Sequence, residues 1–175
     1  TETINMVISE LSTGEYITVG NIDDSRSYDC IENQVRELMF DEEISLIYGD
    51  CLQTTKINET FEENTSQGRR YNFEQFSKEA MLRGNQPHNN PMWRKSLHDK
   101  NGLFESDYKS AGDWEFFLRC AFAGSKYKKL DQPLGLYFFN PKGISTNFEN
   151  FEWKQKEEHK IALETEIGIL DSRNT

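Results

Sequence analysis

The chain has 175 residues, of which 35% are apolar and 13% aromatic, and this length and content indicate one folded domain rather than a disordered segment. Its net charge of -10 disfavours nucleic-acid and anionic membrane partners, because like charges repel. The three cysteines form no CxxC pair or Cys/His cluster, so we expect no disulfide framework, no zinc site and a cytoplasmic setting, and no apolar run approaches the roughly 20 residues that span a bilayer.

The first predicted elements are a helix over residues 4–12 and a strand over Tyr16–Val19. Apolar residues at i, i+3, i+4 and i+7 indicate the helix, and Gly14 follows it as a terminating glycine. The strand is short, β-branched and aromatic. It leads directly into the polar run Asn21-Ile22-Asp23-Asp24, which therefore lies at the end of a strand.

A second helix is predicted to begin near Ser27, with Ser25 or Ser27 as its cap, and a second strand covers residues 44–48. The buried stripe of this helix consists of Ile31, Val35, Leu38 and Met39. A helix between two strands is a βαβ unit, so we expect the two strands to pair in parallel. The polar residues 53–72 are interpreted as an exposed loop or an edge-strand excursion.

The middle of the chain predicts helices over 73–82, 93–101 and 113–122. Residues 83–91 contain two prolines, a glycine and three asparagines, so they form a loop between the first two helices. The third helix is the most regularly amphipathic. Its core face consists of Trp114, Phe117, Leu118, Ala121 and Phe122.

The last third of the chain predicts strands over 126–130 and 134–139 and a charged helix over 152–170. Four apolar residues of this helix are expected to face inward: Ile161, Leu163, Ile167 and Leu170. Its remaining residues are expected to be a solvated face.

The adjacent carboxylates Asp23 and Asp24 are the first candidate site. In open α/β sheets ligands bind beyond the carboxyl ends of strands, and hard oxygen ligands suit Mg²⁺ or Mn²⁺. The same pattern also fits a helix N-terminus, where a carboxylate favours the helix dipole.

Asp113 is the second candidate. It stands at a predicted helix start after Gly112, where a carboxylate can accept a proton from a sugar hydroxyl. An N-cap for the following helix is the structural alternative.

The run from Asn85 to Arg94 is the third candidate. His88 fits a ligand or a solvated loop residue. Trp93 fits a sugar-stacking platform or a core residue. Arg94 fits a phosphate partner or a surface charge.

Four segments, in their order and spacing, resemble family 2 glycosyltransferases, which are inverting enzymes with the GT-A fold. These segments are STGEYITVGNIDDSRSYDCIENQVREL, SLIYGD, NNPMWRKSLHDKNGLFESDYKSAGDWEFFLRCAFAG and LDQPLGLYFFNPKGIST. The resemblance covers roughly residues 5–147. It implies a catalytic and acceptor-side portion over residues 1–150, followed by the charged helix over 151–175.

The resemblance also implies roles for individual residues. Asp23 matches the last aspartate of the family's DXD motif, which holds the metal on the nucleotide diphosphate. Asn21 departs from the motif, because many members have an aspartate there, and Asp24 follows it as a substrate-binding neighbour. Asp113 matches the catalytic base.

Three more residues, Trp93, Arg94 and Trp114, lie near the matching acceptor pocket and are expected to bind substrate. The implied fold is a mixed, mainly parallel sheet flanked by helices. It is a partial GT-A fold lacking the N-terminal nucleotide-binding half, with an exposed sheet edge at which a homo-oligomer could form.

The implied reaction is metal-assisted transfer of a sugar from a UDP- or GDP-sugar to a hydroxyl acceptor with inversion, using Mn²⁺ or Mg²⁺. Two alternatives remain at this level. One is a catalytically inactive carbohydrate-binding or interaction module of the same fold, which Asn21 favours. The other is a different metal-dependent α/β phosphotransfer enzyme that uses Asp23 and Asp24.

Overall fold

The computed structural model describes the backbone of residues 1–173, and their side chains except those at 166, 167 and 169–173. Among these residues no helix is both long and apolar enough to cross a membrane. In chain order the elements are α1 (Glu2–Met6), η1 (Val7–Leu11), β1 (Tyr16–Thr18), β2 (Ser25–Arg26), α2 (Cys30–Phe40), β3 (Ile44–Thr54), β4 (Arg70–Tyr71), α3 (Lys78–Arg83), β5 (Met92–Arg94), α4 (Ser96–Asn101), α5 (Gly112–Phe122), β6 (Lys126–Phe138), η2 (Phe148–Asn150) and α6 (Phe151–Arg173).

The strands form one sheet in the order β1-β5-β3-β6-β2, with β4 paired to the end of β3. The expected mixed sheet flanked by helices is confirmed, but its mainly parallel character is wrong. Over the described residues four of the five strand pairings are antiparallel, and only β3 and β6 pair in parallel. The predicted parallel pairing of the first two strands is also wrong, because β5 lies between β1 and β3, antiparallel to both.

Strand β5 replaces the first part of the helix predicted over 93–101. Both faces of the sheet are covered here, so consecutive residues are buried on opposite sides. Met92 packs in the cluster under α2, and Trp93 packs in the larger cluster on the other face. The helix is therefore confined to α4, and Gly102 closes it with a φ of 79°.

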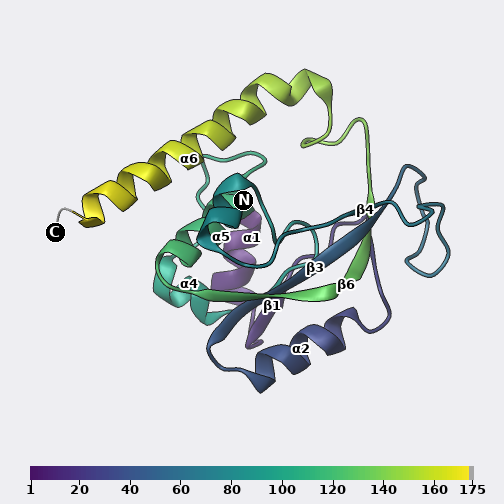
Figure 1. The fold of residues 1–175 in the computed structure, drawn as a ribbon, viewed down its shortest axis with the longest axis horizontal. Helices are drawn as coiled ribbons and strands as arrows, with labels where there is room; N and C mark the ends of the chain where they lie inside the picture. Colours follow the sequence, from purple (N-terminus) through teal and green to yellow (C-terminus); the bar gives the residue numbers. More distant parts are fainter. Residues whose placement is uncertain (174–175) are drawn as a thin grey trace.

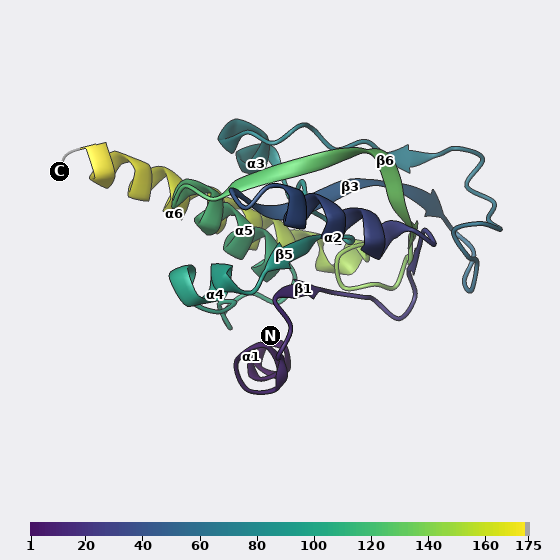
Figure 2. The same cartoon turned by 90° about the horizontal axis from the view of Figure 1, so that it is seen from below.

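Helices cover both faces of the sheet (Figures 1 and 2). On one face α2 packs over Ile47, and on the other Leu46 and Tyr48 join the cluster built by α3, α4 and α5. This alternation along β3 is what a strand with two covered faces requires. The long α6 lies outside these layers on the α5 side and contributes Ile161 to the same cluster (Figure 1).

Several predicted helices differ from the structure in their boundaries and buried faces. Helix α2 begins at Cys30 with Asp29 as its N-cap, whereas Ser25 lies in β2 and Ser27 in the turn after it. Of its predicted stripe Leu38 is buried, but Met39 is 69% exposed. Only the centre of the apolar stripe of α2 faces the sheet, so residues at the edges of the stripe face solvent.

The two terminal helices also bury less than expected. The first helix forms as α1 and η1, but only Ile8 of its apolar stripe is buried. In α6, Ile161 is buried and Leu163 is 44% exposed, so the inward position of Leu163 is wrong. The side chains of Ile167 and Leu170 lie outside the described residues.

Two glycines allow close approaches to the central strands, Gly49 to the neighbouring strand β6 and Gly135 to the loop residue Asn90. A Cβ at Gly49 would lie 2.8 Å from Leu134 Cγ, and one at Gly135 would lie 2.6 Å from Asn90 Oδ1. Real Cβ atoms do not make such contacts, so these two positions in β3 and β6 exclude any larger residue. The predicted strands over 126–130 and 134–139 are one continuous strand, β6, with register shifts near its middle.

Candidate functional site

A cleft of about 400 Å³ lies where the loop after α3, the start of α5 and the start of α6 meet. Six of its lining residues come from the three predicted candidate segments: Asn21, Asn85, His88, Asn89, Asp113 and Trp114. A second groove of similar volume lies between α5 and α6. Of its charged residues, Glu115 and Arg119 pair with each other at 2.7 Å, and Glu164 accepts a hydrogen bond from Tyr108. The first cleft is therefore the candidate site.

Asp113 presents a fixed carboxyl group at the wall of this cleft. Its Oδ2 accepts a hydrogen bond from Asn85 Nδ2 at 2.8 Å, and its Oδ1 accepts one from the backbone N–H of Trp114 at 2.8 Å. Burial raises the pKa of Asp113, while these two donors and the nearby His88 act in the opposite direction. The N-cap of α5 is Ala111, so the capping alternative for Asp113 is wrong.

A chain of side-chain contacts joins Asp113 to the loop after β1. The backbone N–H of His88 donates to Asn85 Oδ1 at 3.3 Å, and the ring atom His88 Nδ1 lies 3.2 Å from Asn89 Oδ1. Asn89 Nδ2 then donates to Asp24 Oδ2 at 3.2 Å, and Asp24 Oδ1 accepts from the backbone N–H of Phe138 at 2.8 Å. Four segments far apart in the sequence thus form one hydrogen-bonded wall.

His88 is part of this wall and is not a solvated loop residue. Its φ of 47° lies in the left-handed region, which non-glycine residues adopt uncommonly and often at functional sites. The centroid of its ring lies 5.4 Å from that of Tyr71, 5.1 Å from that of Phe73 and 5.0 Å from that of Tyr137. This aromatic enclosure desolvates the imidazole and lowers its pKa, so the ring is neutral at pH 7.

The DXD-like run is open and lightly held. Asn21 Nδ2 donates to Asp24 Oδ2 at 2.8 Å, so this amide adds to the hydrogen bonds that the Asp24 carboxylate already accepts from Asn89 and Phe138. Asp23 lies on an exposed turn, and its carboxylate receives no hydrogen bond from the described residues. Within the described part of the chain no three His, Cys, Asp or Glu side chains gather as a resident metal site would require.

This donor set fits a cation that arrives with its ligand. Mg²⁺ is commonly held by one or two carboxylates, with phosphate and water oxygens completing its octahedron. Asp23, with the remaining lone pairs of Asp24, supplies that minimal protein contribution. The residues do not fit a fully protein-coordinated metal centre.

Trp93 does not reach the cleft. Its side chain has no exposed surface, its Nε1–H donates to His98 Nε2 at 3.0 Å, and its ring meets Phe117 edge-on with centroids 5.3 Å apart. The prediction that Trp93 binds substrate is wrong, because a ring without exposed surface cannot stack on a sugar. Trp114 lines the cleft at 7% exposure, while its Nε1–H donates to Met81 O at 2.8 Å, so it is a core residue that closes the cleft floor.

Arg94 lies elsewhere as well. Its guanidinium donates to the carbonyl oxygens of Leu38 and Ile44, the latter at 2.9 Å, and pairs with Glu15 at 3.1 Å. Leu38 is near the C-terminal end of α2, where a cation favours the helix dipole. Arg94 therefore holds α2 against the sheet, and its predicted substrate-binding role is wrong.

Several residues that line the cleft are not among the candidates predicted from the sequence. Arg83 is the last residue of α3, Lys109 precedes α5, Tyr137 belongs to β6, and Lys154 and Glu158 belong to α6. Three of these five are cationic, so the cleft differs in local charge from the strongly acidic chain. Nothing in the pattern of the charged C-terminal helix indicated that two of its residues line a site.

Cys30, Cys51 and Cys120 are free and buried. Burial raises the pKa of Cys51 and Cys120 to about 12, so neither thiol forms a thiolate at neutral pH.

Comparisons with known proteins find similarity to this chain in fold but not in sequence. No protein-family model matches the sequence, and no curated protein is significantly similar to it in sequence. Three crystal structures of TarS from S. aureus are similar in fold. TarS 1-349 in complex with UDP has a TM-score of 0.55 and 15% identity, and the match covers 92% of this chain and 43% of that one.

Two further TarS structures agree with it. TarS 1-349 has a TM-score of 0.54 at 14% identity, covering 78% of this chain and 39% of that chain. A longer TarS structure has a TM-score of 0.53 at 13% identity, covering 81% and 24%. The fold is similar to that of part of the TarS chain. At these identities the likeness establishes the fold alone, and the chain spans less than half the length of each TarS structure.

Proposed function

We propose that the chain is the acceptor-side portion of a family 2 inverting glycosyltransferase of the cytoplasm, which transfers a sugar from a UDP- or GDP-sugar to an acceptor hydroxyl. The observation that carries the proposal is the carboxyl group of Asp113, oriented at a cleft by Asn85 Nδ2 and the Trp114 N–H, each at 2.8 Å. The similarity to TarS, one structure of which holds UDP, supports a nucleotide-sugar donor.

The chemistry follows from the position of Asp113. Its ionised carboxylate accepts the proton of the acceptor hydroxyl as that oxygen attacks the anomeric carbon. The bond between that carbon and the nucleoside diphosphate breaks in the same displacement, and the configuration is inverted because attack occurs opposite the leaving group. Burial raises the pKa of Asp113 and makes its carboxylate a stronger base than one in water, while the two donors fix its direction.

We further propose that Mn²⁺ or Mg²⁺ accompanies the donor diphosphate and is held on the protein side by Asp23, with Asp24 beside it. When bound, such an ion neutralises charge on the leaving group. Asn21 in place of an aspartate leaves a weaker cation site than two free carboxylates provide, so the ion is expected to bind only together with the nucleotide.

An inactive carbohydrate-binding module is the second candidate. Asn21 favours it, because its amide binds Asp24 at 2.8 Å and leaves one open carboxylate for a cation. This candidate predicts that a sugar binds without metal and that no nucleotide is released from a nucleotide sugar.

Calorimetric titration of the chain with Mn²⁺ plus UDP, and then with Mn²⁺ plus GDP, tests the proposal. We expect one nucleotide to bind only when the cation is present, and Asp23→Ala to abolish that binding. Asp99→Ala is the matched control, because it removes an exposed carboxylate from α4 at no cost to the cleft. Failure of both nucleotides to bind would contradict a donor site in this chain, and release of phosphate or pyrophosphate would instead support a phosphotransfer enzyme.

A further inference from the structure

The carboxylate of Glu157, in α6, binds three consecutive backbone N–H groups ahead of α5. Its Oε1 accepts from the N–H of Lys109 at 2.8 Å, and its Oε2 accepts from those of Ser110 at 3.1 Å and Ala111 at 3.2 Å. Hydrogen bonds from backbone amides to a carboxylate are stronger than neutral ones. Glu157 therefore fixes the backbone of this segment at three successive positions.

This contact replaces a cap that α5 does not have. Ala111 is the N-cap of α5, and an alanine side chain cannot accept a hydrogen bond from the first turn. A carboxylate near a helix N-terminus also interacts favourably with the helix dipole. Glu157 supplies both effects from another helix, so the start of α5 depends on α6.

The start of α5 is also the position of Asp113. Asp113 follows the last bound amide by two residues, and its carboxyl group accepts a hydrogen bond from Asn85 in the cleft wall. Lys109 and Ser110 line the same cleft, as do Lys154 and Glu158 on the turns of α6 that flank Glu157. Movement of the segment over 109–111 would displace Asp113 relative to the loop that holds it.

Two further contacts hold α6 against this segment. The Nζ of Lys109 lies 5.9 Å from the centroid of the Trp153 ring, and Tyr108 Oη donates to Glu164 Oε2 at 2.8 Å. The polar face of α6 thus makes specific contacts with the segment ahead of α5, in place of the solvated face expected from its composition.

We propose that Glu157 is a positioning residue for Asp113: by binding the amides of Lys109, Ser110 and Ala111 it fixes the first turn of α5 and the carboxyl group that this turn carries. The proposal rests on the proposed function only for the claim that Asp113 is the base. Glu157 touches neither donor nor acceptor in this role.

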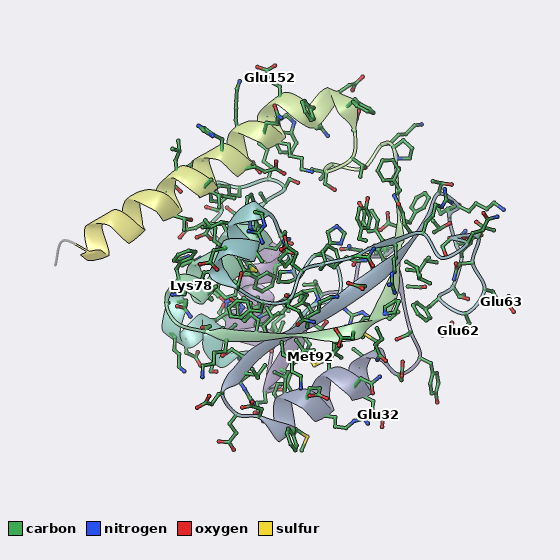
Figure 3. The ribbon with its side chains drawn as sticks, viewed as in Figure 1. Glu32, Glu62, Glu63, Lys78, Met92 and Glu152 are labelled. Atoms are coloured by element: carbon green, nitrogen blue, oxygen red, sulfur yellow. The ribbon has the colours of Figure 1, made fainter. Side chains whose placement is uncertain are left out.

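Nuclear magnetic resonance of the full chain tests the proposal without an activity assay. Glu157→Ala removes all three acceptors, and Glu157→Gln keeps one oxygen. Glu152→Gln is the matched control, because it removes the same charge from the same helix at a side chain that is 85% exposed and projects away from the body of the molecule (Figure 3).

In Glu157→Ala we expect hydrogen exchange of the three amides to accelerate by roughly 10-fold to 100-fold, the equivalent of losing a hydrogen bond to a charged group. The signals of the Asn85 side-chain amide and the Trp114 N–H should shift, because both donate to Asp113. Glu157→Gln should show smaller changes, and Glu152→Gln none. Turnover should fall by about 10-fold to 100-fold in Glu157→Ala while binding of UDP or GDP with Mn²⁺ is unchanged.

Three results would overturn the proposal. Unchanged amide exchange in Glu157→Ala would show that the contact does not hold the segment. Faster exchange with unmoved Asn85 and Trp114 signals would show that Asp113 is positioned by other means, and equal losses of nucleotide binding and turnover would show general unfolding. If Glu157→Ala does not fold, Glu157→Gln gives the same readouts. If the native chain transfers no sugar, the proposed function fails, and the Asn85 and Trp114 signals decide the role of Glu157 by themselves.

Discussion

The two ends of the central sheet carry similar residue types but use them differently. At one end Asp113, Asn85 and His88 surround a cleft, and their polar atoms meet across loops. At the other end the guanidinium of Arg94 donates hydrogen bonds to carbonyl groups at the end of α2 and the start of β3. Polar groups at the first end face a space that a ligand can enter, whereas those of Arg94 at the second end are hydrogen-bonded within the protein.

This difference separates residues that are neighbours in the sequence. His88 and Arg94 are six positions apart, and β5 carries the chain between them from the cleft to the opposite end of the sheet. Substitutions in β5 should therefore change stability and leave the cleft intact, whereas substitutions in the cleft should change ligand binding or turnover. A different outcome of these substitutions would contradict the separation between residues that stabilise the fold and residues that serve the cleft.

Trp93→Ala should have the largest effect on stability. Loss of a buried tryptophan leaves a cavity and removes the hydrogen bond to His98, which should cost about 3–5 kcal/mol of unfolding free energy. Trp93→Phe keeps an aromatic ring there and should lose less. Urea denaturation measures both variants, and weaker nucleotide binding by the folded Trp93→Phe chain would return Trp93 to the substrate site.

Arg94→Met should cost about 1.5–3 kcal/mol, because the carbonyl groups of Leu38 and Ile44 lose a charged donor. Arg36→Met is the control on the exposed side of α2, where a surface charge contributes within about 0.5 kcal/mol. Thermal unfolding compares the two. Equal stability of both variants would mean that Arg94 does not hold α2 to the sheet.

Substitution of the two adjacent aspartates should change stability to different extents. Asp24→Ala should cost about 1–2 kcal/mol, because the Phe138 N–H and the Asn89 amide lose their acceptor. Asp23→Ala should change stability by less than about 0.5 kcal/mol, because its exposed carboxylate holds no part of the described fold. Denaturation curves of the two variants under one condition decide this, and a large loss in Asp23→Ala would contradict an open cation site.

The smallest expected effect is on the pH dependence of stability. Burial raises the pKa of Asp113 above its ordinary value of 3.8, so the folded chain holds this proton more tightly than the unfolded chain. The stability of the native chain relative to Asp113→Asn should be highest below pH 3.8 and should decrease as pH rises through the folded pKa, remaining level above it. An increase over that interval would mean that the two donors outweigh burial.

The predictable part of this molecule is local. Helix α5 was found because Trp114, Phe117 and Phe122 repeat at helical spacing, and Asp113 was placed correctly in its first turn. The loop over 83–91 was found from its prolines and asparagines, and it does contribute to the site. The lining role of Asn21 and Trp114 agrees with their candidate status, although their action on substrate stays a prediction.

The parts that were missed depend on long-range contacts. The three residues of β5 give too short a pattern to separate a strand from the helix that follows, and the sheet order changes once β5 enters it. Arg94 looked free because its carbonyl partners lie 50 or more positions away. Glu157 is one of many charged residues in α6, and only the folded chain shows which amides it meets.

Release of nucleoside diphosphate from UDP- and GDP-sugars, in the presence of Mn²⁺ and a hydroxyl acceptor, is the most direct test of the central claim that the cleft at Asp113 transfers sugar. The account predicts release of UDP or GDP by the native chain and by Asp99→Ala, and a decrease of about 10²–10⁴-fold in folded Asp113→Asn. Equal release by Asp113→Asn would contradict the assignment of this carboxylate as the base.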